Sequence, residues 1–193
     1  GRNQGGASGR PFAEADVAAI ADLQFVEAAT GVLSGQANAV SEEANWVTNI
    51  QGGSASFFLV NNWKVDEGRE FTEQEAQGGS AVVVLGKTAA ANLFPDGNVI
   101  GQRIRINSVP VEVIGVLESK GQGGGMGQDR DDTVVAPLSM VRNRITGGNR
   151  WVSRHVSRIQ VLVQEGYDVA EAQDEATTVM RERRRIEPGQ QDN

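Results

Sequence analysis

The sequence predicts an α+β fold of two subdomains, in which a split α/β layer formed by both chain ends carries an inserted α/β subdomain. Three observations predict it. Short β-branched apolar runs, typical of strands, alternate with segments whose apolar residues recur at helical spacing. The front of the chain indicates helix, strand, strand and the back indicates strand, helix, so the two are expected to pack together. With 193 residues, 39% of them hydrophobic and 22% charged, the chain suits a globular protein with a sizeable core.

The front of the chain predicts a helix followed by a hairpin. The helix is expected over residues 11–23, because Pro11 suits a first turn and the acids Glu14 and Asp16 favour the positive end of the helix dipole. The next elements are expected at residues 25–40 (strand), 46–51 (strand) and 54–59 (a short helical turn). Gly52-Gly53 is expected to end the second strand.

The middle of the chain predicts a strand, a helix and a second hairpin. The apolar run of residues 81–85 suits a buried strand, and the alanine-rich residues 89–94 suit a short helix that Pro95 stops. Two alternating segments follow, with their apolar residues at Ile104, Ile106, Val109, Val111 and Val113. Asn107-Ser108 between them predicts a two-residue turn.

Three further segments complete the pattern. Thr72 and Glu75 predict a capped helix, since the two side chains can satisfy each other's backbone donors. Strands are expected at residues 133–136 and 156–164. A final helix is expected after its cap Asp168, with Glu171 as reciprocal partner, a buried stripe and a basic, solvated end. The stripe is Val169, Ala172, Ala176, Val179 and Met180, and the basic end is Arg181, Arg183, Arg184 and Arg185.

Composition excludes several classes of function. The chain has 18 basic and 25 acidic residues, and this net charge of -7 argues against a general affinity for nucleic acid or anionic lipid. It has no cysteine, which rules out disulfides, thiolate nucleophiles and cysteine-ligated zinc. No run of about 18 apolar residues is present to predict a membrane span.

Motifs that suggest chemistry are incomplete. Gly86-Lys87-Thr88 imitates the end of a phosphate-binding loop, but the preceding residues form a strand in place of the required glycine-rich loop, so Lys87 is expected to face solvent. The lone His155 lacks a marked nucleophile and carboxylate, and a structural or surface role is expected. The acidic residues 129–132 lack the order of an EF-hand, and predict a solvated loop or one that carries partner contacts. The tryptophans Trp46, Trp63 and Trp151 are expected in the core or at a junction.

Residues 121–127, rich in glycine, predict a mobile loop. Such a loop is either a flexible contact element, with an adaptable apolar tip and charged neighbours, or a tolerated surface insertion. We expect partner contacts at Met126, Gln128, Asp129 and Arg130.

An ordered set of motifs spans the centre of the chain: Leu85-Gly86, Leu93-Phe94-Pro95, Ile100-Gly101, Arg103-Ile104-Arg105-Ile106 and Val113-Ile114-Gly115-Val116. Residues 52–138 thereby resemble the periplasmic core domain of MacB-like ABC transporter permeases, in the FtsX-like permease family. The resemblance implies that residues 11–53 and 152–187 form a porter-like subdomain and that residues 54–151 form an inserted Sabre-like subdomain. Residues 1–10 would be a flexible linker or an expression remnant, and residues 188–193 a linker.

The resemblance implies a non-catalytic periplasmic domain of an inner-membrane permease, whose transmembrane helices lie outside this sequence. ATP hydrolysis is expected on a separate cytoplasmic nucleotide-binding domain or subunit, and the permease is expected to be a homodimer or heterodimer. Substrate would be exported through a periplasmic adaptor (membrane fusion protein) and an outer-membrane channel. No cofactor and no nucleic-acid partner are expected. Lipoprotein release, cell-wall hydrolase regulation and a standalone ligand- or peptide-binding module stay open as alternatives.

Overall fold

The computed structural model describes residues 12–120, 129–145 and 155–189, with side chains as far as Arg183. The strands are β1 (Phe12–Ala13), β2 (Val26–Val40), β3 (Asn45–Gly53), β4 (Val65–Gly68), β5 (Val82–Leu85), β6 (Arg103–Ile106), β7 (Val109–Leu117), β8 (Thr133–Pro137), β9 (His155–Val156) and β10 (Arg158–Val163). The helices are α1 (Glu14–Ala21), α2 (Phe57–Val60), α3 (Glu73–Gly78), α4 (Lys87–Leu93), α5 (Leu138–Met140), the π-helix η1 (Val141–Ile145) and α6 (Val169–Gly189). Strands β1 and β9 form a separate pair, and the others form one mixed sheet in the order β10-β2-β3-β8-β5-β7-β4, with β6 beside β2 and β7.

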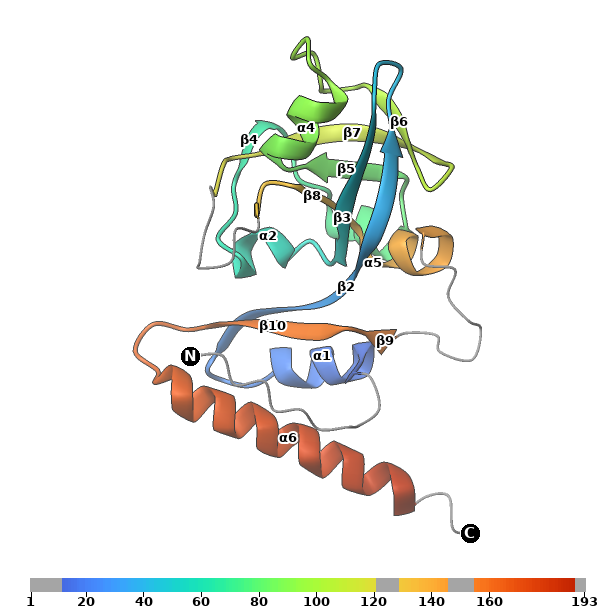
Figure 1. Ribbon diagram of the computed structural model, residues 1–193. Helices are drawn as coiled ribbons and strands as arrows, with labels where there is room; N and C mark the ends of the chain where they lie inside the picture. Colours follow the sequence, from blue (N-terminus) through green and yellow to red (C-terminus); the bar gives the residue numbers. More distant parts are fainter. Residues whose placement is uncertain (1–11, 121–128, 146–154, 190–193) are drawn as a thin grey trace.

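The long strand β2 connects two parts of the molecule. Its residues 26–32 pair with β10, and its residues 33–40 pair with β3. Figure 1 shows β2 passing from a lower layer, where β9, β10, α1 and α6 lie, into an upper part that holds β3 to β8 and α2 to α5. We call residues 12–32 and 155–189 the terminal layer, and residues 33–145 the central unit.

The central unit is built on strands that are buried on both faces. Along β5, Val83 and Leu85 pack in a cluster with Leu93 of α4, whereas Val84 packs in a second cluster with Phe57 and Phe58 of α2. Strands β7 and β8 alternate between the same two clusters. The continuous apolar runs in the sequence thus reflect burial on two sides, because side chains of successive strand residues point to opposite faces.

The terminal layer has one smaller cluster. Ile20 of α1 and Ala172 and Met180 of α6 pack there with Phe25 and Val26 at the start of β2. Strand β10 contributes its alternating Ile159, Val161 and Val163, as the sequence predicts, but each is only partly buried. This layer therefore excludes less apolar surface from water than the central unit does.

Several local predictions are confirmed. In α3 the hydroxyl of Thr72 accepts from the backbone N–H of Glu75, and the carboxylate of Glu75 accepts from the backbone N–H of Thr72. Asn107 and Ser108 adopt positive φ angles of 47° and 71°, as the two-residue turn between β6 and β7 requires. Asp168 caps α6 by accepting from the backbone N–H of Ala170 at 2.8 Å.

Other boundaries differ from the predictions. The first helix begins at Glu14, later than expected, because Phe12 and Ala13 pair with β9 as a short strand. Strand β3 continues through Gly52 and Gly53, which pair with β8. These glycines permit close packing: a Cβ at Gly52 would lie 2.9 Å from the Cβ of Val141.

Near the end of the chain, the expected strand over residues 156–164 is divided into β9 and β10, with Ser157 between them. Val169 does not belong to the buried stripe of α6, since 66% of its surface is exposed. The expected loop at residues 121–127 lies outside the described residues.

The proposed subdomain boundaries stay a prediction. The hydrophobic clusters group the described residues differently from a boundary at residue 53, because Ala37, Ala39 and Ile50 pack in the same cluster as Val83 and Leu93 of the central unit. Pairing of β2 changes from β10 to β3 between residues 32 and 33, and we take this point as the seam between the two parts.

Candidate functional site

The turn that imitates a phosphate-binding loop is filled by the chain itself. The backbone N–H groups of Thr88 and Ala89 at the start of α4 donate to the carbonyl oxygen of Asp131 at 3.2 and 3.4 Å. A Cβ at Gly86 would lie 2.2 Å from that same oxygen, so the glycine serves this close approach. Lys87 is exposed, as predicted, and pairs with Asp66 at 2.7 Å. The donors that would hold a phosphate at this helix end are therefore engaged.

The three carboxylates within residues 129–132 accept hydrogen bonds from other parts of the protein. Asp131 is only 5% exposed and accepts from the hydroxyl of Ser119 at 2.6 Å and from the backbone N–H of Lys120 at 2.8 Å. Asp132 accepts from Trp46 Nε1 at 2.8 Å and from Thr48 Oγ1 at 2.7 Å. The expectation of a solvated loop is thus wrong for these two carboxylates, because they join the start of β8 to β3 and to the end of β7. Across the described ranges, no cluster of three or more His, Asp or Glu side chains could hold a metal ion.

The four residues predicted to contact a partner are only partly described. Met126 and Gln128 lie outside the described residues. Asp129 accepts a hydrogen bond from the hydroxyl of Thr88, while Arg130 is exposed. A partner contact at these residues stays a prediction. Of the two that the structure describes, Arg130 is the one whose side chain is exposed to solvent.

The single histidine and two of the tryptophans have structural positions. His155 lies in β9, where its carbonyl oxygen accepts from Arg142 Nη2 at 3.3 Å. Trp63 is buried and donates to the carbonyl oxygen of Glu118 at 2.8 Å, and Trp46 is partly buried against the core. The predicted core positions of these two tryptophans are confirmed, and Trp151 lies outside the described residues.

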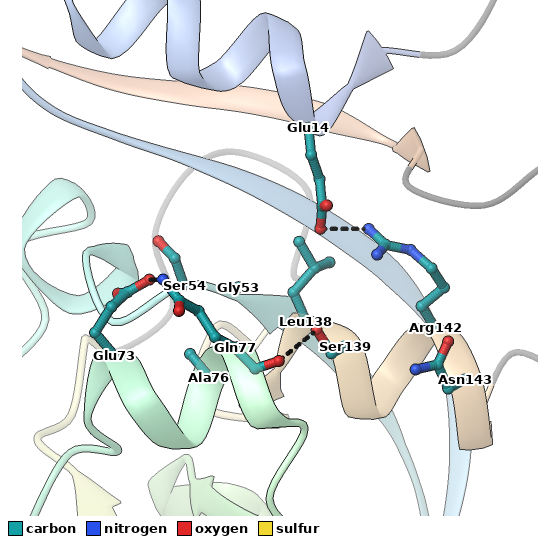
Figure 2. Close-up of a pocket in the computed structure, with 10 residues that line it drawn as sticks. All are labelled: Glu14, Gly53, Ser54, Glu73, Ala76, Gln77, Leu138, Ser139, Arg142 and Asn143. Carbon is teal, nitrogen blue, oxygen red and sulfur yellow. Dashed lines mark hydrogen bonds and ion pairs between the residues drawn. The ribbon is translucent and has the colours of Figure 1, made fainter.

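A cleft lies at the seam between the terminal layer and the central unit. It has a volume of about 420 Å³ and is lined by Glu14, Gly53, Ser54, Glu73, Ala76, Gln77, Leu138, Ser139, Arg142 and Asn143. Figure 2 shows Glu14 reaching down from α1 towards Arg142 on η1, while Glu73 and Gln77 project from α3 on the opposite side. Glu14 is the one lining residue from the terminal layer and the other nine belong to the central unit, so the cleft lies where the two parts meet, a usual place for functional clefts.

An ion pair spans the seam cleft. Arg142 Nη2 lies 2.9 Å from Glu14 Oε1, and the same nitrogen donates to the carbonyl oxygen of His155 in β9. The side chain of Arg142 is 12% exposed and that of Glu14 is 36% exposed, so the pair has a sheltered side and an open side. Arg142 projects from a π-helix, a form that is rare and is often found at functional positions.

The other side of the seam is closed by hydrogen bonds along the sheet. Arg158 of β10 donates to Ser34 Oγ and to Gln51 Oε1, both at 2.7 Å. Burial lowers the pKa of Arg158. Gln160 of the same strand accepts from Asn61 Nδ2 at 2.8 Å. These contacts and the continuous strand β2 hold the two parts together at this side.

Sequence reasoning did not identify the seam residues. It assigned Glu14 to the helix dipole and gave no role to Arg142 or Arg158. A signal did exist at Arg158, since a cation that precedes the apolar alternation of β10 must be exposed or paired. The arrangement of ion pair and hydrogen bonds joins the terminal layer to the central unit at two places.

No helix within the described parts of the chain is both long and apolar enough to cross a bilayer. The family described as MacB-like periplasmic core domain matches residues 1–179. Solved structures share the fold. The periplasmic region of MacB from Actinobacillus actinomycetemcomitans has a TM-score of 0.74 at 23% identity, over 89% of this chain and 73% of that one. The extracellular domain of the noncanonic ABC-type transporter YknZ from Gram-positive bacteria has a TM-score of 0.73 at 20% identity, over 90% and 84%.

Curated relatives are longer proteins. The macrolide export ATP-binding/permease protein MacB of Bdellovibrio bacteriovorus is 33% identical over 153 residues, which cover 79% of this chain and 22% of the relative. The protein of the same name from Azoarcus sp. is 31% identical over 172 residues, with coverages of 89% and 25%. The pyoverdine export ATP-binding/permease protein PvdT of Pseudomonas entomophila is 33% identical over 135 residues, with coverages of 69% and 20%. The chain thus spans a quarter or less of the length of these relatives.

Proposed function

The chain belongs to the family of MacB-like periplasmic core domains, and from this premise we propose that it is the periplasmic part of an ABC transporter permease that works by transmitting movement. The family match over residues 1–179 is the observation that carries the proposal. In this function the domain performs no catalysis. ATP is hydrolysed by a cytoplasmic nucleotide-binding domain or subunit, and the periplasmic domain changes its arrangement in response.

The position of the first and last described elements supports transmission of movement. The first described strand, β1, pairs with β9 of the terminal layer, and Figure 1 shows α6 in the same layer. A displacement applied at β1 or at α6 would first reach this layer. It would then pass to the central unit through β2 and through the seam contacts of Arg158 and Arg142. Two inputs would therefore act on one body.

We further propose that a periplasmic adaptor and an outer-membrane channel receive the exported substrate, and that two permease chains act as a dimer. Relatives named for macrolide and pyoverdine export support an export role over the sister roles in lipoprotein release and cell-wall hydrolase regulation. The fold is shared with an extracellular domain from Gram-positive bacteria, so the family description, more than the fold, supports a periplasmic location.

The test is a calorimetric titration of the domain with the purified adaptor protein from the same genome, beside a titration with ATP. We expect saturable adaptor binding and no heat from ATP. ATP binding would contradict the filled helix end at Thr88. Absence of adaptor binding, both to the domain and to the full-length permease in detergent, would contradict the export assignment.

A pair of variants locates the surface. Arg130→Gln is expected to weaken adaptor binding, because removal of a contacting charge at an interface rim slows association. Arg105→Gln, a change at an exposed arginine on β6, is the matched control and should bind as the unchanged domain does. If the unchanged domain, Arg130→Gln and Arg105→Gln bind the adaptor with equal affinity, the predicted contact at Arg130 is wrong.

A further inference from the structure

The two sides of the seam are built differently. On one side β2 runs without interruption from β10 to β3, and Arg158 ties β10 to Ser34 and Gln51. On the other side α1 faces α3, α5 and η1 across the seam cleft, and the pair of Glu14 and Arg142 spans it. A joint that is continuous on one side and open on the other has the form of a hinge.

The hydrophobic clusters do not oppose such movement. Val32, at the point where β2 changes partner, packs with Phe57 and Phe58 of the central unit; the cluster of α1, α6 and the start of β2 is otherwise separate from the two central clusters, and the seam cleft is lined mainly by polar side chains. Opening the cleft therefore exposes little apolar surface, and polar contacts between two cores are the usual setting of relative domain motion. The polar contacts that hold this side closed include the Glu14–Arg142 ion pair and the hydrogen bonds that the backbone N–H and the hydroxyl of Ser54 donate to Thr30 Oγ1 at 3.2 and 3.0 Å.

We propose that the Glu14–Arg142 pair is a latch, and that its release lets the terminal layer rotate about β2 and widen the seam cleft. The pivot lies between residues 32 and 33, where β2 exchanges β10 for β3 as its partner. Arg142 holds both α1, through Glu14, and β9, through the carbonyl oxygen of His155, so one side chain restrains two elements of the terminal layer. The latch is a property of this chain alone, and it does not depend on the proposed role in transport.

The latch is weak enough to open. Glu14 is about one-third exposed, so water and salt screen the pair. Loss of the pair is expected to raise the population of the open form about fivefold, which corresponds to about 1 kcal/mol. An open form populated at about a few per cent would thus become a substantial one, and a shift of this size is measurable.

The absence of cysteine makes a distance measurement direct, because two introduced cysteines are the only labelling sites. Ala18→Cys on α1 and Gln74→Cys on α3 place spin labels at exposed positions on the two sides of the seam. Gln74→Cys with Asn98→Cys places both labels in the central unit and is the internal control. Distance distributions are recorded by pulsed electron spin resonance for the unchanged seam and for Glu14→Gln, which removes the charge and nearly keeps the shape.

We expect Glu14→Gln to add a population at longer distance for the Ala18–Gln74 pair and to leave the Gln74–Asn98 pair unchanged. Asp66→Asn is the matched variant, because it breaks an ion pair of 2.7 Å that lies wholly within the central unit, and it should leave both distributions unchanged. Salt at about 1 M should widen the Ala18–Gln74 distribution of the unchanged protein in the same direction, since it screens the pair.

If the Ala18–Gln74 distance distribution is the same in Glu14→Gln as in the unchanged protein, the latch proposal is wrong and the joint between the two parts is rigid. Equal broadening of both label pairs would also overturn it, because the change would then loosen the whole chain. Should Glu14→Gln fail to fold, the salt series on the unchanged protein decides, and a distribution that does not respond to salt rejects the proposal.

Discussion

The central unit and the terminal layer are stabilised in different ways. In the central unit, strands β5, β7 and β8 are buried on both faces. The ring of Phe58 packs edge to face against those of Phe57 and Phe71, with centroid distances of 5.7 and 5.1 Å. In the terminal layer every residue of β10 is only partly buried, and one small cluster joins α1, α6 and the start of β2. The central unit resembles the interior of an independent domain, whereas the terminal layer depends on what it docks against.

This difference teaches where the molecule can move. A core packed on two sides resists deformation, because loss of any contact leaves a void. A layer joined by one strand and by polar contacts can rotate at small cost in apolar burial. Substitutions should accordingly have large effects on the whole fold in the central unit, and smaller, local effects in the terminal layer.

The largest effect is expected at Gly86. Its φ of -69° suits any residue, so the cost of Gly86→Ala is steric: the new Cβ would lie 2.2 Å from the carbonyl oxygen of Asp131, and two buried backbone segments must separate. We expect a loss of more than about 4 kcal/mol of unfolding free energy, measured by urea denaturation. Gly78→Ala, where nothing lies within 4 Å of the added Cβ, is the control and should change stability by less than about 1 kcal/mol. A Gly86→Ala protein of normal stability would show that the approach of α4 to β8 is not rigid.

The second effect compares the two cores directly. Leu93 in α4 is fully buried, and Leu93→Ala should cost about 3–5 kcal/mol by leaving a cavity. Met180 in α6 is 9% exposed in a small cluster that can collapse, so Met180→Ala should cost about 2 kcal/mol. Hydrogen exchange should show that Leu93→Ala speeds exchange throughout the sheet, whereas Met180→Ala speeds it in α6 and β10 alone. Global acceleration by both variants would mean that the two parts unfold as one unit.

Much of the local structure was predictable from single dominant signals. The cap of α3 follows from Thr72 and Glu75, because the spacing of three residues satisfies two backbone donors at once. The apolar run of β5 predicted a buried strand, and the pair Asn107-Ser108 predicted a two-residue turn. In each case the energetic cause lies within a few residues, so no partner elsewhere in the chain had to be known.

The seam was not predictable, because its contacts join distant residues without a local signature. Glu14 and Arg142 are separated by 128 positions, and Arg158 and Gln51 by 107. Gly52-Gly53 was interpreted as the end of a strand, since glycine is a breaker in isolation, yet there it admits Val141 against β3. Long-range charge pairs and close backbone approaches depend on topology, and topology fixes them only after the strands have paired.

The hydrogen bonds of Arg158 offer a third test, with a smaller effect. Arg158→Met nearly keeps the volume but leaves Ser34 Oγ and Gln51 Oε1 without their donor. We expect a loss of about 2 kcal/mol, because hydrogen bonds to a charged group are worth more than neutral ones. Faster exchange should be confined to β10 and the first half of β2. Accelerated exchange in β5 and β7 would contradict the separation of the terminal layer from the central unit.

The smallest effect concerns pH and lies within the central unit. The guanidinium of Arg69, at 2.7 Å, and the backbone N–H of Thr72 lower the pKa of Glu75 from 4.5 to about 2. Because the pKa is lower in the folded state, the stabilisation is fully present above pH 4.5 and is lost as the pH falls towards 2.

The size of this stabilisation should be below about 1 kcal/mol, since Arg69 is more than half exposed and water screens the pair. Above pH 4.5, Glu75→Gln should therefore lower the Tm by a small amount, and the difference from the unchanged protein should shrink as the pH falls through 2. Glu67→Gln, at an exposed carboxylate of β4, gives the baseline for removal of one charge in the same unit. A Tm difference for Glu75→Gln that stays constant over this range would mean that Glu75 stabilises α3 through its shape and not through its charge.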